Sequence, residues 1–259
     1  MNTDSLNFTK NSLCGVGRGI FVHVLIYPLD VVKMRQQCSP QATSIATALK
    51  ILKEEGLRAF YKGLSAQLTK TSMKQIWVWP IMIETPSYLE KYNIGDLSQQ
   101  AITGFSIATI DAAITTPLEK AKICAALSGK SSLRFLDVYK KNGWQGFATH
   151  WTSLSVKWSS ALVMQKYLRS KYRSKQQDPL TLAQLAEIGV QMALVIGIIS
   201  TPFDILNTLK QGKNVNPKDL FLEGTLRKFY KGLPLHILAL TIHNIATVVV
   251  IDKLTSQAL

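Results

Sequence analysis

The feature that most constrains this chain is a six-residue segment that occurs three times. The copies are PLDVVK at residues 28–33, PLEKAK at 117–122 and PFDILN at 202–207. Each begins with a proline and carries an acid two residues later, and the first two carry a base three residues after the acid. An acid and a base at that spacing lie on one face of a helix. The recurrence predicts three tandem repeats, with Asn207 in place of the third base.

Small residues precede each proline at four-residue intervals. The positions thirteen, nine and five before the prolines are Gly15, Gly19 and His23, then Gly104, Ala108 and Ala112, then Gly189, Ala193 and Gly197. A stripe of small residues lets helices approach closely in lipid. The repeats therefore favour one threefold helical body over separate domains.

A second motif follows the first by about twenty residues. It consists of EG and then FYKG, at residues 55–56 and 60–63 and again at 223–224 and 229–232. In the middle repeat, an alignment without gaps sets His150 on Gly63, and the motif has decayed. In this alignment only the glycine after the acid position, Gly143, and the phenylalanine, Phe147, survive.

Composition alone leaves two classes open. Of 259 residues, 47% are hydrophobic and 18% charged, and the formal net charge is +14. Such a chain is either a basic nucleic-acid binder or a membrane protein that binds anions. No stretch reaches roughly 18 uninterrupted apolar residues, but spanning helices around a water-filled cavity carry polar stripes. The repeats favour the membrane protein.

Other classes find less support in the sequence. No helix-turn-helix, zinc or RNA-binding signature supports a soluble nucleic-acid binder. No phosphate loop, metal-ligand cluster or nucleophile with a nearby base supports an enzyme. The three cysteines, Cys14, Cys38 and Cys124, are scattered and imply neither a disulfide framework nor a metal site.

The hydrophobic pattern predicts an all-helical chain. Long helices are expected at residues 9–37, 64–91, 97–127, 149–172, 180–211 and 233–254, and short ones at 45–54 and 132–141. The apolar spacing in 45–54 is that of an amphipathic helix lying along a surface. The repeats are predicted to span 1–95, 96–175 and 176–259.

Together these motifs resemble the mitochondrial carrier family of solute transporters (solute carrier 25 type), of which this chain looks like a divergent member. The resemblance covers nearly the whole chain. It implies an all-α membrane protein with six transmembrane helices in three pseudo-threefold repeats and short surface helices on the matrix side. It also implies a multi-pass monomer of the mitochondrial inner membrane, in contact with the lipid bilayer and cardiolipin, with no cofactor, no bound metal and no nucleic-acid partner.

The resemblance also implies a matrix gate, in which the acid of each odd helix pairs with the base of the next. Carried over, Asp30 would pair with Lys122 and Asp204 with Lys33, whereas Glu119 would face Asn207 without an ion partner. Gln37 and Gln211 stand where a glutamine braces a pair in some members. Loss of one pair, worth about 1 kcal/mol, would bias the protein toward the matrix-open state.

The opposite, cytoplasmic gate is predicted to be weak. Glu84 and Asp252 would supply acids, but Ser87, Leu168 and Thr255 fall where the family has bases. These departures keep a degenerate carrier acting as a uniporter among the alternatives.

The resemblance also implies that substrate binds about halfway along the even helices, which are the second, fourth and sixth long helices. Lys70 and Lys157 lie seven residues after Gly63 and His150, and two lysines at equal depth in one cavity would form an anion site. Lys74 lies one turn beyond Lys70. His23, together with His236 or His243, would add hydrogen bonds, and Trp158 would stack on a planar group such as a nucleobase.

Simpler roles stay open for these residues. Lys70 would also be explained by snorkelling to an interface, and Trp158 by packing. Asp111, in the third helix, has no assigned partner.

The function expected from these residues is transport of anionic metabolites by alternating access through a basic cavity. Nucleotides such as ATP and ADP, moved by antiport, are the first expectation. Di- or tricarboxylates or other anions are the alternative.

Overall fold

The structure, a computed structural model, describes residues 3–39, 43–128, 144, 146–173, 181–216 and 226–256. Six long helices dominate it: α1 (Thr3–Cys38), α3 (Leu64–Glu90), α4 (Asp96–Ser128), α6 (Phe147–Arg173), α7 (Leu182–Lys213) and α10 (Leu233–Ser256). Three short elements join them: α2 (Ser44–Glu55), the 3₁₀ helix η1 (Leu57–Tyr61) and α9 (Leu226–Phe229). The all-α prediction is confirmed, and the helix predicted at 132–141 lies outside the described residues.

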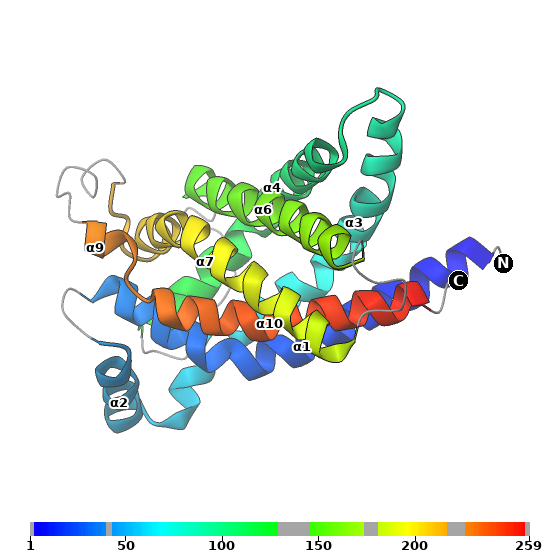
Figure 1. The fold of residues 1–259 in the computed structure, drawn as a ribbon. Coiled ribbons are helices and arrows are strands. Elements are labelled where there is room, and N and C mark those ends of the chain that lie inside the picture. The colour runs from blue at the N-terminus through cyan, green and yellow to red at the C-terminus, as the bar shows by residue number, and fades with distance from the viewer. Residues whose placement is uncertain are drawn as a thin grey trace.

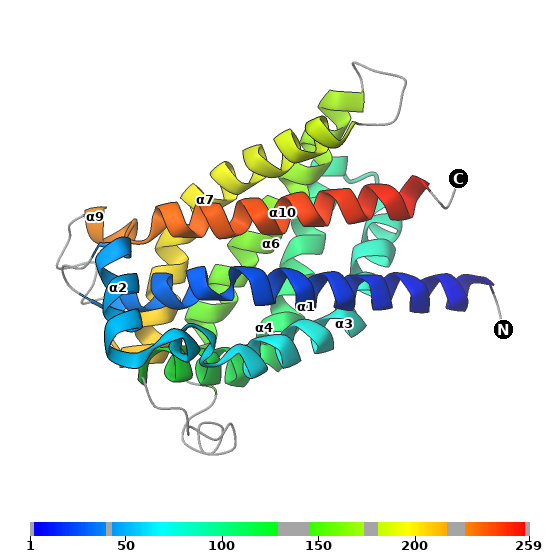
Figure 2. The same ribbon diagram turned by 90° about the horizontal axis from the view of Figure 1, so that it is seen from below.

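The long helices form a closed ring. Each packs against the next in the order α1, α3, α4, α6, α7 and α10, and α10 packs against α1 to complete the circle. Figures 1 and 2 show that α1 begins and α10 ends at one end of the bundle, whereas α2 and α9 lie at the other. The three helices that carry the repeated motif, α1, α4 and α7, alternate with the other three around this ring.

The glycine stripe marks places where helix backbones meet. A Cβ atom added to Gly104 in α4 would lie 2.5 Å from the backbone of Ser159 in α6. One added to Gly189 in α7 would lie 2.9 Å from the backbone of Ile245 in α10. Any larger residue would push these helices apart, which is the physical reason for the pattern.

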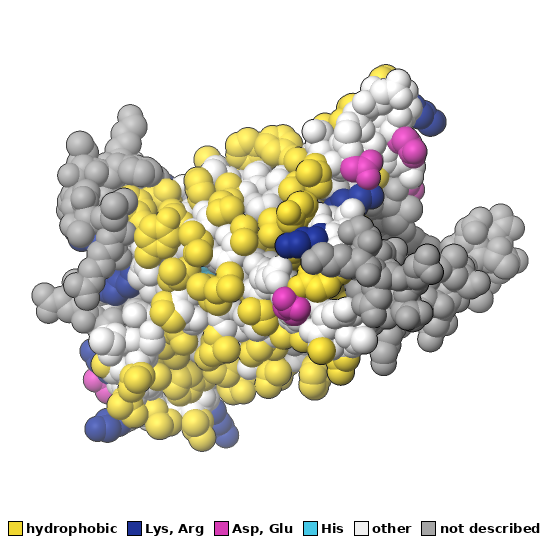
Figure 3. Space-filling model, in the orientation of Figure 1, with side chains coloured by type: hydrophobic (Ala, Val, Ile, Leu, Met, Phe, Trp, Pro, Cys, Tyr) yellow, Lys and Arg dark blue, Asp and Glu magenta, His cyan; other side chains and the backbone are white. Residues whose placement is uncertain are grey.

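The outer surface of the ring is apolar. Large hydrophobic side chains such as Phe21 and Ile76 are 72% and 70% exposed. Figure 3 shows hydrophobic side chains covering most of the visible body between its two ends. By length and composition α4 and α7 each contain a stretch able to cross a membrane. An apolar exterior around a polar interior is the arrangement expected for a bundle with a central cavity in lipid.

The short helix α2 is amphipathic, as predicted. Thr47 and Ile51 are buried against the body, whereas Ile45, Leu49 and Leu52 are exposed. The spacing of these apolar residues therefore marks an outward face suited to a membrane interface.

Candidate functional site

A single cavity of about 260 Å³ opens at the centre of the ring, and all six long helices contribute to its lining. Its charged lining consists of Lys33, Lys70, Lys74, Lys122 and Lys157 with Asp30, Asp111, Glu119 and Asp204. All four histidines of the chain also line it: His23, His150, His236 and His243. Of the predicted site residues, Gln37 and Gln211 alone do not line it. Within the described ranges no three His, Cys, Asp or Glu side chains gather as metal ligands would.

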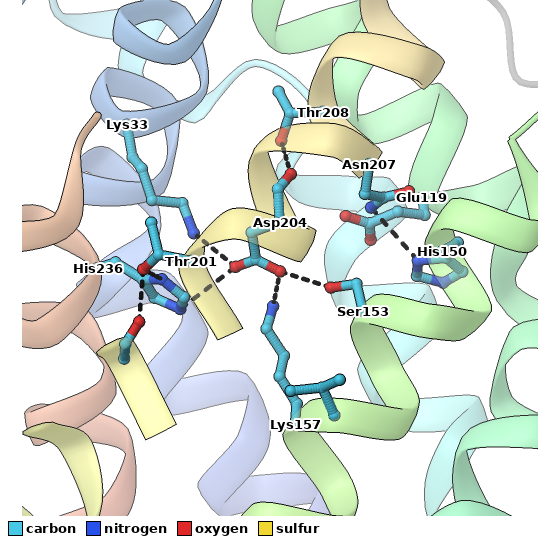
Figure 4. Close-up of polar contacts among 12 residues, drawn as sticks. Lys33, Glu119, His150, Ser153, Lys157, Thr201, Asp204, Asn207, Thr208 and His236 are labelled. Carbon is cyan, nitrogen blue, oxygen red and sulfur yellow. Dashed lines mark hydrogen bonds and ion pairs between the residues drawn. The ribbon is translucent and has the colours of Figure 1, made fainter. Parts of the chain in front are cut away.

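One group of contacts, which we call the Asp204 cluster, joins four helices. Asp204 Oδ1 accepts a hydrogen bond of 2.6 Å from Ser153 Oγ and pairs with Lys157 Nζ, both from α6. Asp204 Oδ2 lies 3.6 Å from Lys33 Nζ of α1 and 3.3 Å from His236 Nε2 of α10. Figure 4 shows these side chains converging on the carboxylate. The contact with Lys33 is the one expected from the motif.

A second group, the Glu119 cluster, joins only two helices. Glu119 Oε2 pairs with Lys70 Nζ of α3 at 2.6 Å, and Oε1 pairs with Lys122 Nζ of α4 itself at 2.7 Å. The prediction that Glu119 lacks an ion partner is therefore wrong. A buried carboxylate without a nearby cation is costly, and two lysines within reach supply the charge that Asn207 does not.

The third acid of the motif has no such cluster. Asp30 lies 3.9 Å from Lys33 on its own helix, and the predicted pair with Lys122 is not formed, because Lys122 is held by Glu119. Ala239 of α10 stands seven residues after Gly232, as Lys70 stands seven residues after Gly63. Ala239 is buried and has no charge, so it offers Asp30 no counterpart of Lys70.

Asn207 is held by neutral partners instead of an ion pair. Its amide nitrogen Nδ2 lies 3.5 Å from His150 Nδ1, and Gln211 Nε2 donates to its Oδ1 at 2.7 Å. Gln211 therefore contacts a neutral amide here, where the resemblance implied that it would brace an ion pair. The amide of Gln37 is buried and makes no hydrogen bond with any described residue, so this glutamine braces no pair in the present arrangement.

The structure corrects the alignment of the middle repeat by four residues. Gly63, Gly146 and Gly232 stand directly before α3, α6 and α10, with φ of 89°, 88° and 81°. The residue four further on donates its backbone N–H to each glycine carbonyl, and these residues are Gln67, His150 and His236. A positive φ strongly favours glycine. Gly146, and not His150, therefore matches Gly63.

This shift changes which lysines are equivalent. Counted from the glycines, Ser153 matches Lys70, and Lys157 matches Lys74. Ser153 approaches Asp204 as Lys70 approaches Glu119, each from the helix that precedes the acid. Lys157 lies one turn further along α6 than Ser153 and also reaches Asp204. Lys70 and Lys157 thus lie at different depths, contrary to the prediction.

The deeper level of the cavity holds an aromatic side chain with charges beside it. Lys74 Nζ lies 5.7 Å from the centre of the Trp158 ring, and the indole N–H of Trp158 points to Asp111 Oδ2 at 3.5 Å. On the opposite side, the rings of His23 and His243 meet edge to face at 5.6 Å, and His23 Nδ1 contacts the Gly19 carbonyl at 2.7 Å. Of the predicted substrate-binding residues, Lys74 and Trp158 are therefore in contact here, and His23 lines the same cavity.

Ser153 and His150 were missed as site residues. The sequence contained a sign of them in the triplet Trp144-Gln145-Gly146, whose aromatic residue and glycine have the spacing of Tyr61 and Gly63. An alignment that allowed a gap would have matched the two triplets. It would then have set Ser153 at the level of Lys70.

Comparison with known families agrees with this architecture. A family model described as "Mitochondrial carrier protein" matches residues 4–91. Over 96% of its length the chain is 24% identical to the mitochondrial 2-oxoglutarate/malate carrier protein of Bos taurus, of which it covers 90%. It is 23% identical to the mitochondrial citrate transporter C of Aspergillus niger, over 86% of this chain and 82% of that one.

Other relatives match over a shorter stretch. The chain is 29% identical to the mitochondrial S-adenosylmethionine carrier protein of Mus musculus over 51% of each chain. An uncharacterised mitochondrial carrier of Schizosaccharomyces pombe is 28% identical, and the chain spans 46% of its length.

Proposed function

The chain belongs to the mitochondrial carrier family, multi-pass proteins of the mitochondrial inner membrane, and we propose that it carries a small anionic metabolite by alternating access through its central cavity. The observation that carries the proposal is the double use of the cavity lysines. Lys70 and Lys157 are the cations predicted to bind substrate, and each also holds an acid of the matrix gate.

This double use couples binding to opening. An anion that takes over Lys70 and Lys157 competes with Glu119 and Asp204 for the same ammonium groups. Exchange of one anionic partner for another leaves each lysine paired at every stage, which avoids the cost of an isolated buried charge. The acids then lose a cation, and the helices that they join separate more easily. Bound substrate would therefore favour the state in which the matrix gate is open and substrate can leave.

We place carboxylates ahead of nucleotides as substrates. The cavity volume of about 260 Å³ is below the usual range of roughly 300 to 1,000 Å³ for ligand pockets. Lys74 already lies over Trp158, so the ring that would stack on a base has a cation beside it. The relatives with the longest matches named above are carriers of 2-oxoglutarate, malate and citrate. Trp158 is the residue that keeps nucleotides as a second candidate.

Uniport is a second mode of operation that one contact favours. At Asn207 the gate has an amide and His150 where an ion pair is expected. A gate with fewer ion pairs has a lower barrier to returning without substrate, which would relax the requirement for exchange. We further propose that the protein is a monomer in contact with the lipid bilayer and cardiolipin. Its repeats would span residues 1–95, 96–175 and 176–259.

Uptake into proteoliposomes tests it. We expect uptake of 2-oxoglutarate, malate or citrate to exceed that of ATP or ADP, and Lys70→Ala and Lys157→Ala each to abolish it. Lys166→Ala is a matched control, because Lys166 forms an exposed pair with Asp96. Unchanged uptake in both cavity variants would refute the site. Uptake with and without substrate inside the vesicle separates exchange from uniport.

A further inference from the structure

Asp111 is a buried acid that the proposed gate does not use. It lies on α4, lines the cavity and is 1% exposed. Its Oδ2 faces the indole N–H of Trp158 at 3.5 Å, a long hydrogen bond. Its Oδ1 accepts no hydrogen bond from any described residue. An ionised oxygen without a donor is expensive in such surroundings.

The fold itself does not require an acid at this position. Asp111 stands six residues before Pro117, and the residues six before Pro28 and Pro202 are Val22 and Ile196. Both are buried hydrophobic residues, 3% and 2% exposed. The same place in the helix ring is thus filled twice by an apolar side chain. The carboxylate in the middle repeat is an exception that calls for a ligand.

Among the described residues no lysine or arginine forms an ion pair with the Asp111 carboxylate. Lys70 pairs with Glu119 at 2.6 Å and not with Asp111. Lys74 is attracted to Asp111 electrostatically, but its ammonium lies over the Trp158 ring. A positive group between Asp111 and the indole would gain a charge-assisted hydrogen bond to Oδ1 and a favourable contact with the aromatic ring.

We propose that Asp111 binds the ammonium group of a zwitterionic substrate, whose carboxylate is held by Lys74 and Lys157. The preferred substrate is then a small amino acid with an acidic side chain, which should bind more tightly than a plain dicarboxylate. A primary ammonium has three N–H donors and suits a single carboxylate oxygen. A divalent metal ion would need several oxygen ligands, whereas the hydrogen-bond partner of the Asp111 carboxylate among the described residues is the Trp158 indole N–H, a donor. This inference rests on the proposed function, since it assumes that small carboxylates enter the cavity.

Two probes that differ only in the amino group test the proposal. Aspartate and succinate have the same carbon chain and the same two carboxylates, and only aspartate carries the ammonium. We expect purified wild-type protein to bind aspartate about tenfold or more tightly than succinate, the effect of one charge-assisted hydrogen bond. Asp111→Asn, which keeps the size of the side chain, should bring the two affinities within about threefold. Binding is measured by calorimetry in detergent.

Asp96→Asn is the matched control. It makes the same chemical change on the same helix, at an exposed residue outside the cavity, and should keep the preference for aspartate. Thermal unfolding of each variant establishes that it is folded. Equal affinities in the wild type, or an undiminished preference in Asp111→Asn, would overturn the inference and leave the carrier proposal standing. Failure of folded wild-type protein to bind either probe, 2-oxoglutarate, malate or citrate would overturn both.

Discussion

The Asp204 cluster and the Glu119 cluster occupy the same place in successive repeats and solve the same problem differently. Asp204 takes its partners from α1, α6 and α10. Glu119 takes one lysine from α3 and one from its own helix. The first ties four helices together, whereas the second ties two. A threefold sequence motif therefore need not give a threefold gate.

Two substitutions account for the difference. Ser153 stands where Lys70 stands in the first repeat, so Asp204 receives a hydroxyl at that level and its lysine from one turn further. Asn207 stands where a base is expected, so Glu119 receives no cation from α7. Lys122 then pairs with Glu119, and among the described residues Asp30 keeps Lys33 as its one ion partner. One missing base thus affects two of the three predicted pairs.

The largest difference between the Asp204 cluster and the Glu119 cluster is expected when the acid of each is neutralised in turn. Asp204→Asn leaves Lys33, Lys157 and His236 close together without their anion, and we expect a loss of about 3 kcal/mol or more in folding stability. Glu119→Gln strands two lysines between two helices and should cost less. Thermal unfolding of both detergent-purified variants measures the difference. A loss from Glu119→Gln that equals or exceeds that from Asp204→Asn would contradict the ranking.

The next largest effect on folding stability is expected from removing the hydroxyl of Ser153, which stands where Lys70 stands in the first repeat. Ser153→Ala deletes the 2.6 Å hydrogen bond to Asp204 and should cost about 1.5 kcal/mol, as expected for a hydrogen bond to a charged group. Thr152→Ala is the control, because Thr152 is half-buried on the same helix and its hydroxyl donates to the Ala148 carbonyl of that helix and not to Asp204. Unfolding temperatures compare the two. Equal shifts would mean that the Ser153 contact adds nothing.

Restoring a base at residue 207 tests whether its absence explains the pairing of Glu119 with Lys122. In Asn207→Lys the new ammonium faces Glu119, and Lys122 becomes available to Asp30. The added pair, worth about 1 kcal/mol, should strengthen the matrix gate and lower uptake into vesicles without internal substrate about fivefold. The same substitution in an Asp30→Asn background should give a smaller effect. If the two effects are equal, Lys122 has not moved to Asp30.

The smallest effect is expected at an ion cluster outside the cavity, which serves as a reference. Glu55 accepts hydrogen bonds from Arg35 and Lys62, and the bond from Arg35 is the main cause that lowers the pKa of Glu55 from 4.5 to about 2. A lowered pKa stabilises the folded state above pH 4.5, and this stabilisation is lost as the pH falls toward 2. Because Glu55 is partly exposed, the gain is at most about 1 kcal/mol.

Glu55→Gln tests this reference cluster. The variant should unfold at a lower temperature than the wild type at pH 7, and the gap should close between pH 4.5 and 2. Unfolding temperatures measured across that range check it. A gap that persists at pH 2 would show that the effect does not come from the charge.

The fold was largely predictable because its causes are local. Helices expected at 64–91 and 233–254 are found at Leu64–Glu90 and Leu233–Ser256, since turn residues and apolar spacing are set by near neighbours. The glycine stripe predicted close packing, and Gly104 shows it. Contacts between distant segments were harder to predict. The motif located Asp30, Glu119 and Asp204, but it did not tell which lysine each acid would take.

The sequence by itself determined the threefold repetition, the helix lengths and the acids that face the cavity, because these follow from residue spacing along one chain. Only the tertiary structure decided that Gly146 begins the middle even helix, that Ser153 and Lys157 share Asp204, and that Lys122 stays with Glu119. The physical reason is that an ammonium group pairs with the carboxylate that is nearest in space. That distance depends on how six helices are set beside one another, and a register shift of four residues moves each side chain by about one turn.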